Sequence, residues 1–314
     1  MNLTNPIFQD ADKAREHLEK TRWPHGAECP HCGSVGEATK LQGKAARPGV
    51  WQCNACREQF TVTVGTVFES SKVPLNKWLL ATYLMSASKK GVSAHQLHRT
   101  LGVTYKTAWF MAHRIREAMN PGASPSPLGG EGKVVEADET FVGGREKNKH
   151  ASKRKAGGPG NWRMEPVVTL VERDGRARSF HVANVTAKTL GNVLRTTADR
   201  ASHLMTDGAT IYTKVGKEFA AHSVLDHAAG EYARMGFHHS NTVENYFSIL
   251  KRGVTGVYHH VSPAHLARYL AEFDFRYSHR SGLGIEDAER TNEVLRNVAG
   301  KRLTYRRSDE GANA

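Results

Sequence analysis

The chain has 314 residues, of which 39% are hydrophobic, which is enough for one large core or two compact ones. No run of about 18 apolar residues occurs, and the polar segment 1–20 is unlike a secretory or transit peptide, so we expect a cytoplasmic protein with no membrane partner. Lysine and arginine number 44 against 31 acids, a net charge of +13, which favours a polyanionic partner such as nucleic acid.

All four cysteines lie in one stretch and form two pairs, Cys29 with Cys32 and Cys53 with Cys56. Each C-x-x-C turn can direct two thiolates at one ion, and two such turns complete a tetrahedral zinc site. Disulfides fit poorly with a chain that shows no secretory signal, and a redox motif needs only one pair. We therefore predict a structural Zn²⁺ ion bound by all four thiolates, in a small ribbon that depends on the metal for its stability.

Short strands are expected around the cysteines, because residues 50–52 and 59–64 alternate between apolar and polar side chains. Together with an N-terminal extension, this zinc ribbon is predicted to occupy residues 1–70.

Helical spacing begins at Pro74, and we predict a helix-turn-helix DNA-binding segment over residues 71–120. Ser93 is a suitable N-cap for a second helix that runs to Leu101, Gly102 allows a turn, and Thr104 caps a third helix. In a helix-turn-helix the start of the last helix enters the major groove. An ordinary helical hairpin with solvated polar residues is the alternative. The predicted DNA-contacting residues are Thr104, Tyr105, Lys106, Thr107 and Arg114.

Proline, glycine and serine crowd residues 121–130, so a linker is expected there. A strand around Asp138 follows, then two strands joined by Asp174-Gly175, the strongest local hairpin signal. Thr186 is expected to cap a helix, and His203–Ala209 reads as a strand that carries Asp207 near its end. Residues 222–225 read as one more strand, and the next helix contains Asn241, Glu244 and Lys251.

This order of elements is expected of an α/β fold of the RNase H-like class, a mixed sheet flanked by helices, over residues 131–285. A C-terminal helix and tail are expected over residues 286–314. Carboxylates at Asp138, Asp207 and Glu244 that converge in such a fold can hold two divalent ions about 3.5–4 Å apart, and Mg²⁺ suits such oxygen ligands. From strand alternation we expect Glu136 and Glu139 to point to the opposite face from Asp138.

These motifs closely resemble the DDE-type insertion-sequence transposases that carry an N-terminal zinc ribbon. The resemblance extends from about residue 29 to 279 and is most specific in 239–253 and in Tyr258-His-His-Val. It implies a retroviral-integrase-like fold, DNA strand cleavage and strand transfer with Mg²⁺ or Mn²⁺, and catalytic roles for Asp138, Asp207, Glu244 and Lys251. Double-stranded DNA, as terminal inverted repeats and target, is the implied partner, with a homo-oligomer in the synaptic complex.

Several alternatives remain open at this point. Asn241 stands three residues before Glu244 on one helix face and could assist or replace it as the third ligand. Lys251 is either a phosphate contact near the cleaved end or a surface lysine, and the basic residues between 145 and 155 form either a phosphate-binding or a solvated loop. A zinc-ribbon regulator with an inactive RNase H-like domain, and a nuclease without end specificity, are the rival functions.

Overall fold

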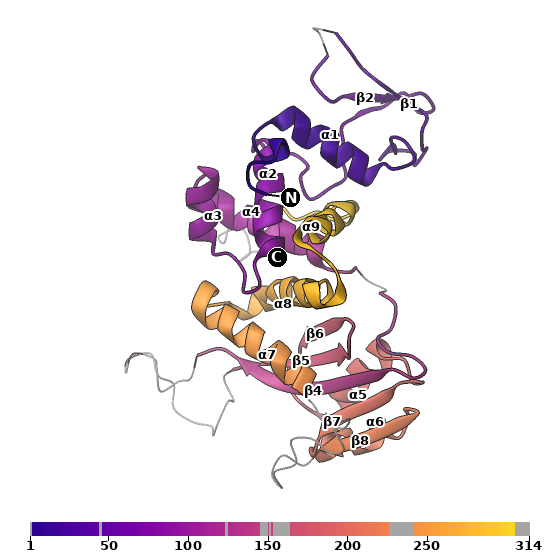
Figure 1. Cartoon of the computed structure of the whole chain (residues 1–314), viewed down its shortest axis with the longest axis vertical. Helices are drawn as coiled ribbons and strands as arrows, with labels where there is room; N and C mark the ends of the chain where they lie inside the picture. Colours follow the sequence, from indigo (N-terminus) through magenta and orange to yellow (C-terminus); the bar gives the residue numbers. More distant parts are fainter. Residues whose placement is uncertain are drawn as a thin grey trace, which may run out of the picture. The chain divides into compact units, whose positions relative to one another are not determined.

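The computed structural model describes residues 2–43, 46–122, 125–144, 150, 152, 164–225 and 241–304. The chain forms two compact units (Figure 1). Unit 1 comprises the chain up to Asn120 together with the segment from Ile285 onward, and unit 2 is Pro121–Gly284. The basic residues of the loop predicted between 145 and 155 lie outside the described residues.

In unit 1, a short 3₁₀ turn and a capped helix precede the ribbon. Asp10 accepts hydrogen bonds from the backbone N–H groups of Asp12 and Lys13, which fixes the start of α1. The ribbon is a three-stranded antiparallel sheet in the order β1-β2-β3. These elements are η1 (Pro6–Phe8), α1 (Ala11–Arg22), β1 (Ala38–Lys40), β2 (Trp51–Cys53) and β3 (Gln59–Phe60).

The strand predicted over residues 59–64 is shorter than expected. Strand β3 ends at Phe60, and the N–H of Val64 then donates to the carbonyl of Thr61 at 3.1 Å, which closes a turn. The hydroxyls of Thr61 and Thr63 bond each other at 2.9 Å, so alternating polar residues here stabilise a turn instead of a strand.

Helices α2 (Leu75–Ala87), α3 (Ala94–Leu101) and α4 (Tyr105–Met119) confirm the predicted helical segment. Ser93 accepts from the N–H of Gln96 and Thr104 from that of Thr107, so both expected N-caps form. Gly102 ends α3 with φ +60°, a left-handed conformation that glycine adopts without a Cβ clash. The short helix, glycine turn and longer helix are therefore all present.

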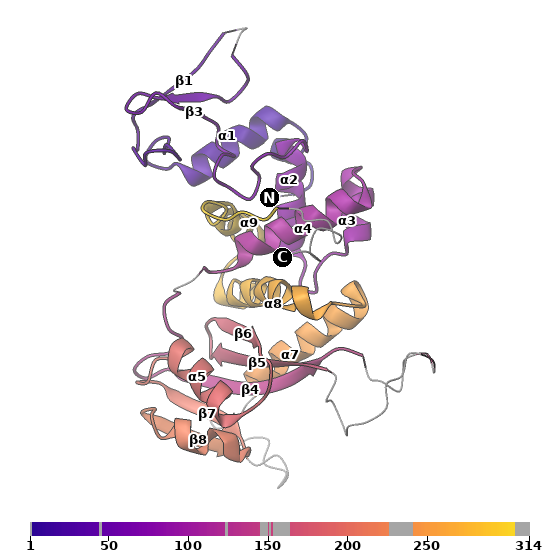
Figure 2. The ribbon, with the colours of Figure 1, turned by 180° about the vertical axis from the view of Figure 1, so that it is seen from behind.

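The C-terminal helix α9 (Asp287–Arg296) belongs to unit 1, where it contacts α1, α2 and α4 (Figure 2). Backbone bonds extend this contact: Val67 N–H donates to Val298 at 3.1 Å, and Gly300 N–H donates to Gly65 at 2.9 Å. Arg290, only 6% exposed, donates to the carbonyl of Ser86. Unit 1 is thus built from both ends of the chain.

Unit 2 is built on a five-stranded sheet in the order β6-β5-β4-β7-β8. Strand β4 pairs antiparallel with β5 and parallel with β7, β5 pairs antiparallel with β6, and β7 pairs parallel with β8. The sheet comprises β4 (Val134–Val142), β5 (Glu165–Glu172), β6 (Ala177–His181), β7 (His203–Asp207) and β8 (Ala221–Leu225). This order of a three-strand meander followed by two parallel strands confirms the predicted RNase H-like fold.

Two apolar layers cover the sheet. One contains α5 (Ala187–Thr197), whose Leu190 and Leu194 pack on Val135 and Ala137 of β4. The other contains α7 (Asn241–Gly253) and α8 (Pro263–Ser278), which pack on β5 through residues such as Tyr246. The remaining elements are η4 (Thr210–Tyr212), α6 (Thr213–Gly216), the π-helical turn η6 (Val254–Tyr258) and η7 (Ser281–Leu283).

Candidate active site and cysteine cluster

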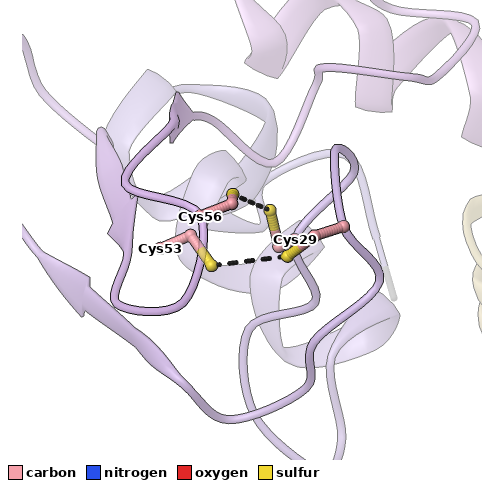
Figure 3. Close-up of side chains that lie close together, drawn as sticks. Cys29, Cys53 and Cys56 are labelled. Carbon is pink, nitrogen blue, oxygen red and sulfur yellow. Dashed lines mark hydrogen bonds between the residues drawn. The ribbon is translucent and has the colours of Figure 1, made fainter.

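The four cysteine sulfurs come together in the ribbon, with all four Sγ atoms within 4.8 Å of one another (Figure 3). Cys29 Sγ lies 3.7 Å from Cys56 Sγ, and Cys32 Sγ lies 3.6 Å from Cys53 Sγ. A tetrahedral zinc site with 2.3 Å Zn–S bonds has S···S edges of roughly 3.8 Å. The cysteine cluster therefore has the geometry of a tetrathiolate zinc site.

The thiols of the cluster differ in how readily they ionise, because burial and the neighbouring thiols raise the pKa of Cys56 whereas that of Cys53 is lowered. The backbone N–H of Cys56 and the hydroxyl of Ser34 lower the pKa of Cys53 to about 6. A thiolate is the form that binds zinc, so Cys53 is ready to bind the ion at neutral pH.

The three predicted catalytic acids come from three elements of unit 2. Asp138 lies on β4, Asp207 is the last residue of β7, and Glu244 lies in the first turn of α7. In the parallel β4–β7 register Ala137 faces Thr206, so Asp138 and Asp207 follow on neighbouring strands. Tyr246, on the same helix as Glu244, packs with buried residues of β5 on one face of the sheet. The fold therefore directs all three elements to one region.

The electrostatics of Asp138 reflect both its burial and the acids around it. Burial, together with the negative charges of Glu139, Asp207 and Glu244, raises the pKa of Asp138 to about 7. The backbone N–H of Glu139, 2.7 Å from Asp138 Oδ1, opposes this by stabilising the charged form. Among the described residues, the four cysteines form a group whose ligand atoms all lie within 4.8 Å of one another. Asp138, Asp207 and Glu244 form no such group, so their carboxylate oxygens are more widely spaced.

Glu139 is an acid to which the sequence analysis assigned no catalytic or metal-binding role. It lies on the α5 face of β4, as alternation predicted, and accepts a hydrogen bond of 2.5 Å from the buried hydroxyl of Tyr212. Its charge contributes to the raised pKa of Asp138, and burial, followed by the charge of Asp207, raises the pKa of Glu139 itself. A fourth carboxylate thus lies beside Asp138 in the chain, on the opposite face of β4.

The prediction for Glu136 is wrong. Residues two apart on a strand share a face, so Glu136 points to the same side as Asp138. Its carboxylate accepts from the N–H groups of Thr242 and Val243 at the start of α7. Strand alternation places Glu136 on the same face as Asp138, but it does not predict the bonds from Glu136 to α7.

Comparisons with known proteins decide the family. Residues 127–278 match the model of the ISXO2-like transposase domain, and residues 9–59 match that of the transposase zinc-ribbon domain. The chain is 30% identical over 280 residues to an uncharacterized protein in transposable element ISH50 of Halobacterium salinarum, covering 86% of this chain and 91% of that protein. The chain belongs to the ISXO2-like transposase family. The predicted zinc-ribbon transposase resemblance is confirmed.

A solved structure is also similar to this transposase, although weakly. A chain of the simian T-cell lymphotropic virus intasome in complex with PP2A regulatory subunit B56 gamma is 16% identical, covering 58% of this chain and 63% of that one. The TM-score of 0.29 is too low to support a conclusion about the fold, which is assigned from the strand order of unit 2.

The residues predicted to contact DNA fall into two groups in the transposase. Thr104, Tyr105 and Lys106 are exposed at the start of α4, and Thr107 is half-buried beside them. Tyr105, 43% exposed, stacks on the exposed ring of His95 with centroids 4.3 Å apart.

Arg114 does not fit the DNA-contacting role. It is 7% exposed and donates to the carbonyl of Glu69 at 2.6 Å, while its guanidinium lies 5.6 Å from the ring centroids of Trp78 and Phe110. Its charge is therefore used inside unit 1, where it ties α4 to the segment before α2.

The remaining predicted residues of the transposase lie on α7. Asn241 is exposed at the first position of the helix, and Lys251 is exposed near its end, with Nζ 5.8 Å from the ring centroid of Phe247. Lys251 lies seven residues, or about two turns, beyond Glu244 and so projects from a similar side. The first two residues of the segment 239–253, to which the resemblance is most specific, lie outside the described residues. Among the described residues, no helix has the length and apolar character needed to span a membrane.

Proposed function

We propose that this chain is a DNA transposase that cuts and joins strands at the ends of its own mobile element. Unit 2 carries out the chemistry through Asp138, Asp207 and Glu244. The observation that carries this proposal is the placement of these acids on β4, at the end of β7 and in the first turn of α7, where the charges of Asp207 and Glu244 contribute to the raised pKa of Asp138.

The donor set fits a pair of Mg²⁺ ions. Magnesium prefers carboxylate oxygens and retains several of its waters, so its ligands need not all touch. Like charges held together at a partly buried site repel one another, and bound cations relieve that repulsion. When bound, the ions activate the attacking oxygen and stabilise the leaving oxygen of the phosphodiester. Mn²⁺ is expected to substitute for Mg²⁺.

The residues of α7 complete the proposed site. Glu244 is the favoured third ligand, because its charge acts on Asp138, and Asn241 one turn earlier is placed to assist it. Lys251, exposed two turns later, is placed to contact a phosphate beside the cleaved bond.

Unit 1 supplies the proposed recognition of the terminal inverted repeats. The exposed start of α4, with Thr104, Tyr105, Lys106 and Thr107, is the surface that a helix-turn-helix presents to the major groove. Two or more copies of the chain pair the ends in a synaptic complex and capture target DNA.

Strand cleavage on DNA that carries the repeats flanking the gene tests the proposal. The wild type should nick repeat ends with Mg²⁺ or Mn²⁺ and leave unrelated duplexes intact. Asp138→Asn should bind the same DNA with unchanged affinity and cut nothing, because the amide binds the cation poorly.

Two results would reject this function in favour of another. Specific binding without cleavage by the wild type, in either metal, would indicate a DNA-binding regulator. Equal cleavage of repeat and unrelated duplexes would indicate a nuclease without end specificity.

A further inference from the structure

Strand β4 carries a second buried acid whose partners lie on the catalytic helix. Glu136 is 0% exposed, and its Oε2 accepts from the backbone N–H groups of Thr242 at 2.9 Å and Val243 at 3.0 Å. Its Oε1 accepts from the hydroxyl of Thr242 at 2.9 Å. The first N–H groups of a helix have no partner within the helix. Glu136 therefore caps α7 from a different element of the fold.

Arg173 balances the charge of this buried carboxylate. Its Nε donates to Glu136 Oε1 at 2.6 Å, and its Nη2 lies 3.0 Å from the sulfur of Met205 on β7. A carboxylate that bonds both a guanidinium and helix N–H groups is held by charge-assisted bonds and by the positive end of the helix dipole. The acid is thus fully paired although it is buried.

The position of these bonds links two of the proposed metal ligands. Asp138 lies two residues after Glu136 on β4, roughly 7 Å along the strand. Glu244 directly follows Val243, and so lies in the turn that Glu136 holds. A shift of that turn displaces Glu244 relative to Asp138, whereas the later part of α7 is fixed by buried Phe247 and Leu250.

We propose that Glu136 is a positioning residue, which sets the distance between Asp138 and Glu244 by holding the first turn of α7 to β4. This inference rests on the proposed two-metal function. It predicts that loss of Glu136 weakens cation binding although Glu136 contacts no ion.

The test uses the full-length, zinc-loaded protein with three variants: Glu136→Ala, Glu136→Gln and the control Glu172→Gln. Glu172 is a matched control, because it is also buried in unit 2 and paired with a cation, Lys133 at 2.8 Å, but its side chain bonds Gly129 instead of α7. Two readouts need no DNA: amide hydrogen exchange of the peptide over 241–246, and Mn²⁺ affinity by electron paramagnetic resonance.

Glu136→Ala should speed amide exchange in the first turn of α7 and weaken Mn²⁺ binding by about 10–100-fold, the range for loss of groups that orient metal ligands. Glu136→Gln keeps one acceptor oxygen and should fall between Glu136→Ala and the wild type. Glu172→Gln should match the wild type in both readouts.

Unchanged exchange and Mn²⁺ affinity in both Glu136 variants would overturn the inference, as would equal losses in Glu172→Gln. If Glu136→Ala does not fold, Glu136→Gln decides by the same criteria. A wild type that binds Mn²⁺ but never cuts DNA refutes the proposed function alone. A wild type that binds no Mn²⁺ also refutes that function. Amide exchange of α7 in the Glu136 variants then tests whether Glu136 holds the first turn of that helix.

Discussion

At the scale of single residues, burial changes the roles that side chain types suggest. Asp274 on α8 is 8% exposed and accepts bonds from the hydroxyl of Tyr246 at 2.5 Å and from the hydroxyl and N–H of Ser179, each at 2.7 Å. Burial nevertheless raises the pKa of Asp274 from 3.8 to about 6, and these three donors only partly offset that rise. The residue joins α7, α8 and β6, so its protonation affects the stability of unit 2.

Asp274→Asn should therefore change how stability depends on pH. A raised pKa means that the folded state binds more protons than the unfolded state between pH 4 and 6, so this group lowers stability as pH rises through that range. The asparagine amide can donate to the two hydroxyls while its oxygen accepts from Ser179 N–H, so the variant should fold and lack that decline. Urea unfolding of unit 2 at pH 4 to 7 measures the difference. A decline of equal size in the variant would contradict the prediction.

Lys106 and Arg114 should respond differently to alanine substitution. Lys106→Ala, at the exposed start of α4, should weaken DNA binding and reduce the slope of log K against log salt by about 1. Arg114→Ala should leave that slope unchanged but lower the stability of unit 1 by about 1–3 kcal/mol, since Glu69 loses a buried partner. Salt titrations of binding and thermal melts distinguish the two. A reduced salt slope for Arg114→Ala would show that Arg114 contacts DNA after all.

At the scale of elements, local signals predicted the structure where a short-range bond decides the conformation. Ser93, Thr104 and Thr186 each cap the helix that follows, and the hairpin forms at Asp174, whose φ is +51°. Expectations failed where partners are distant in the chain. The burial of Arg114 depends on Glu69 and Trp78, and the helix-capping role of Glu136 depends on Thr242. No spacing rule relates such residues.

Helix α9 illustrates an element whose partners lie far away in sequence. Leu295→Ala should destabilise unit 1 by about 2–5 kcal/mol, because Leu295 is 0% exposed where the C-terminal segment packs. Leu3→Ala, in the same unit but 54% exposed, serves as the control and should change stability by less than about 0.5 kcal/mol. Four of the five tryptophans lie between residues 23 and 109, so fluorescence reports mainly on this unit. Equal effects of both substitutions would exclude a stabilising role for α9.

At the scale of the whole molecule, the chain passes from unit 1 into unit 2 and back. The sequence indicated the boundary near residue 120 through its proline and glycine content, and it predicted a C-terminal helix and tail over residues 286–314 without relating that helix to unit 1. Composition marks a linker, whereas the return of α9 depends on apolar packing and on backbone bonds such as that from Gly300 to Gly65. The proposed recognition and the proposed chemistry thus belong to units with separate cores.

Removal of zinc should therefore affect one unit only. Chelation should unfold the ribbon and abolish recognition of repeat DNA, because its small sheet depends on the four thiolates. The sheet of unit 2 has apolar cores of its own and should keep its amide protection. Hydrogen exchange of β4 and β5 with and without chelator measures this. Loss of that protection would show that the units do not fold independently.

The central claim is that Asp138, Asp207 and Glu244 hold a pair of divalent cations. Calorimetric titration of the zinc-loaded protein with Mn²⁺, without DNA, tests it most directly. The wild type should bind two ions, while Asp138→Asn and Glu244→Gln should each bind them more weakly or lose one. Identical Mn²⁺ binding by the wild type and both variants would show that these side chains share no cation.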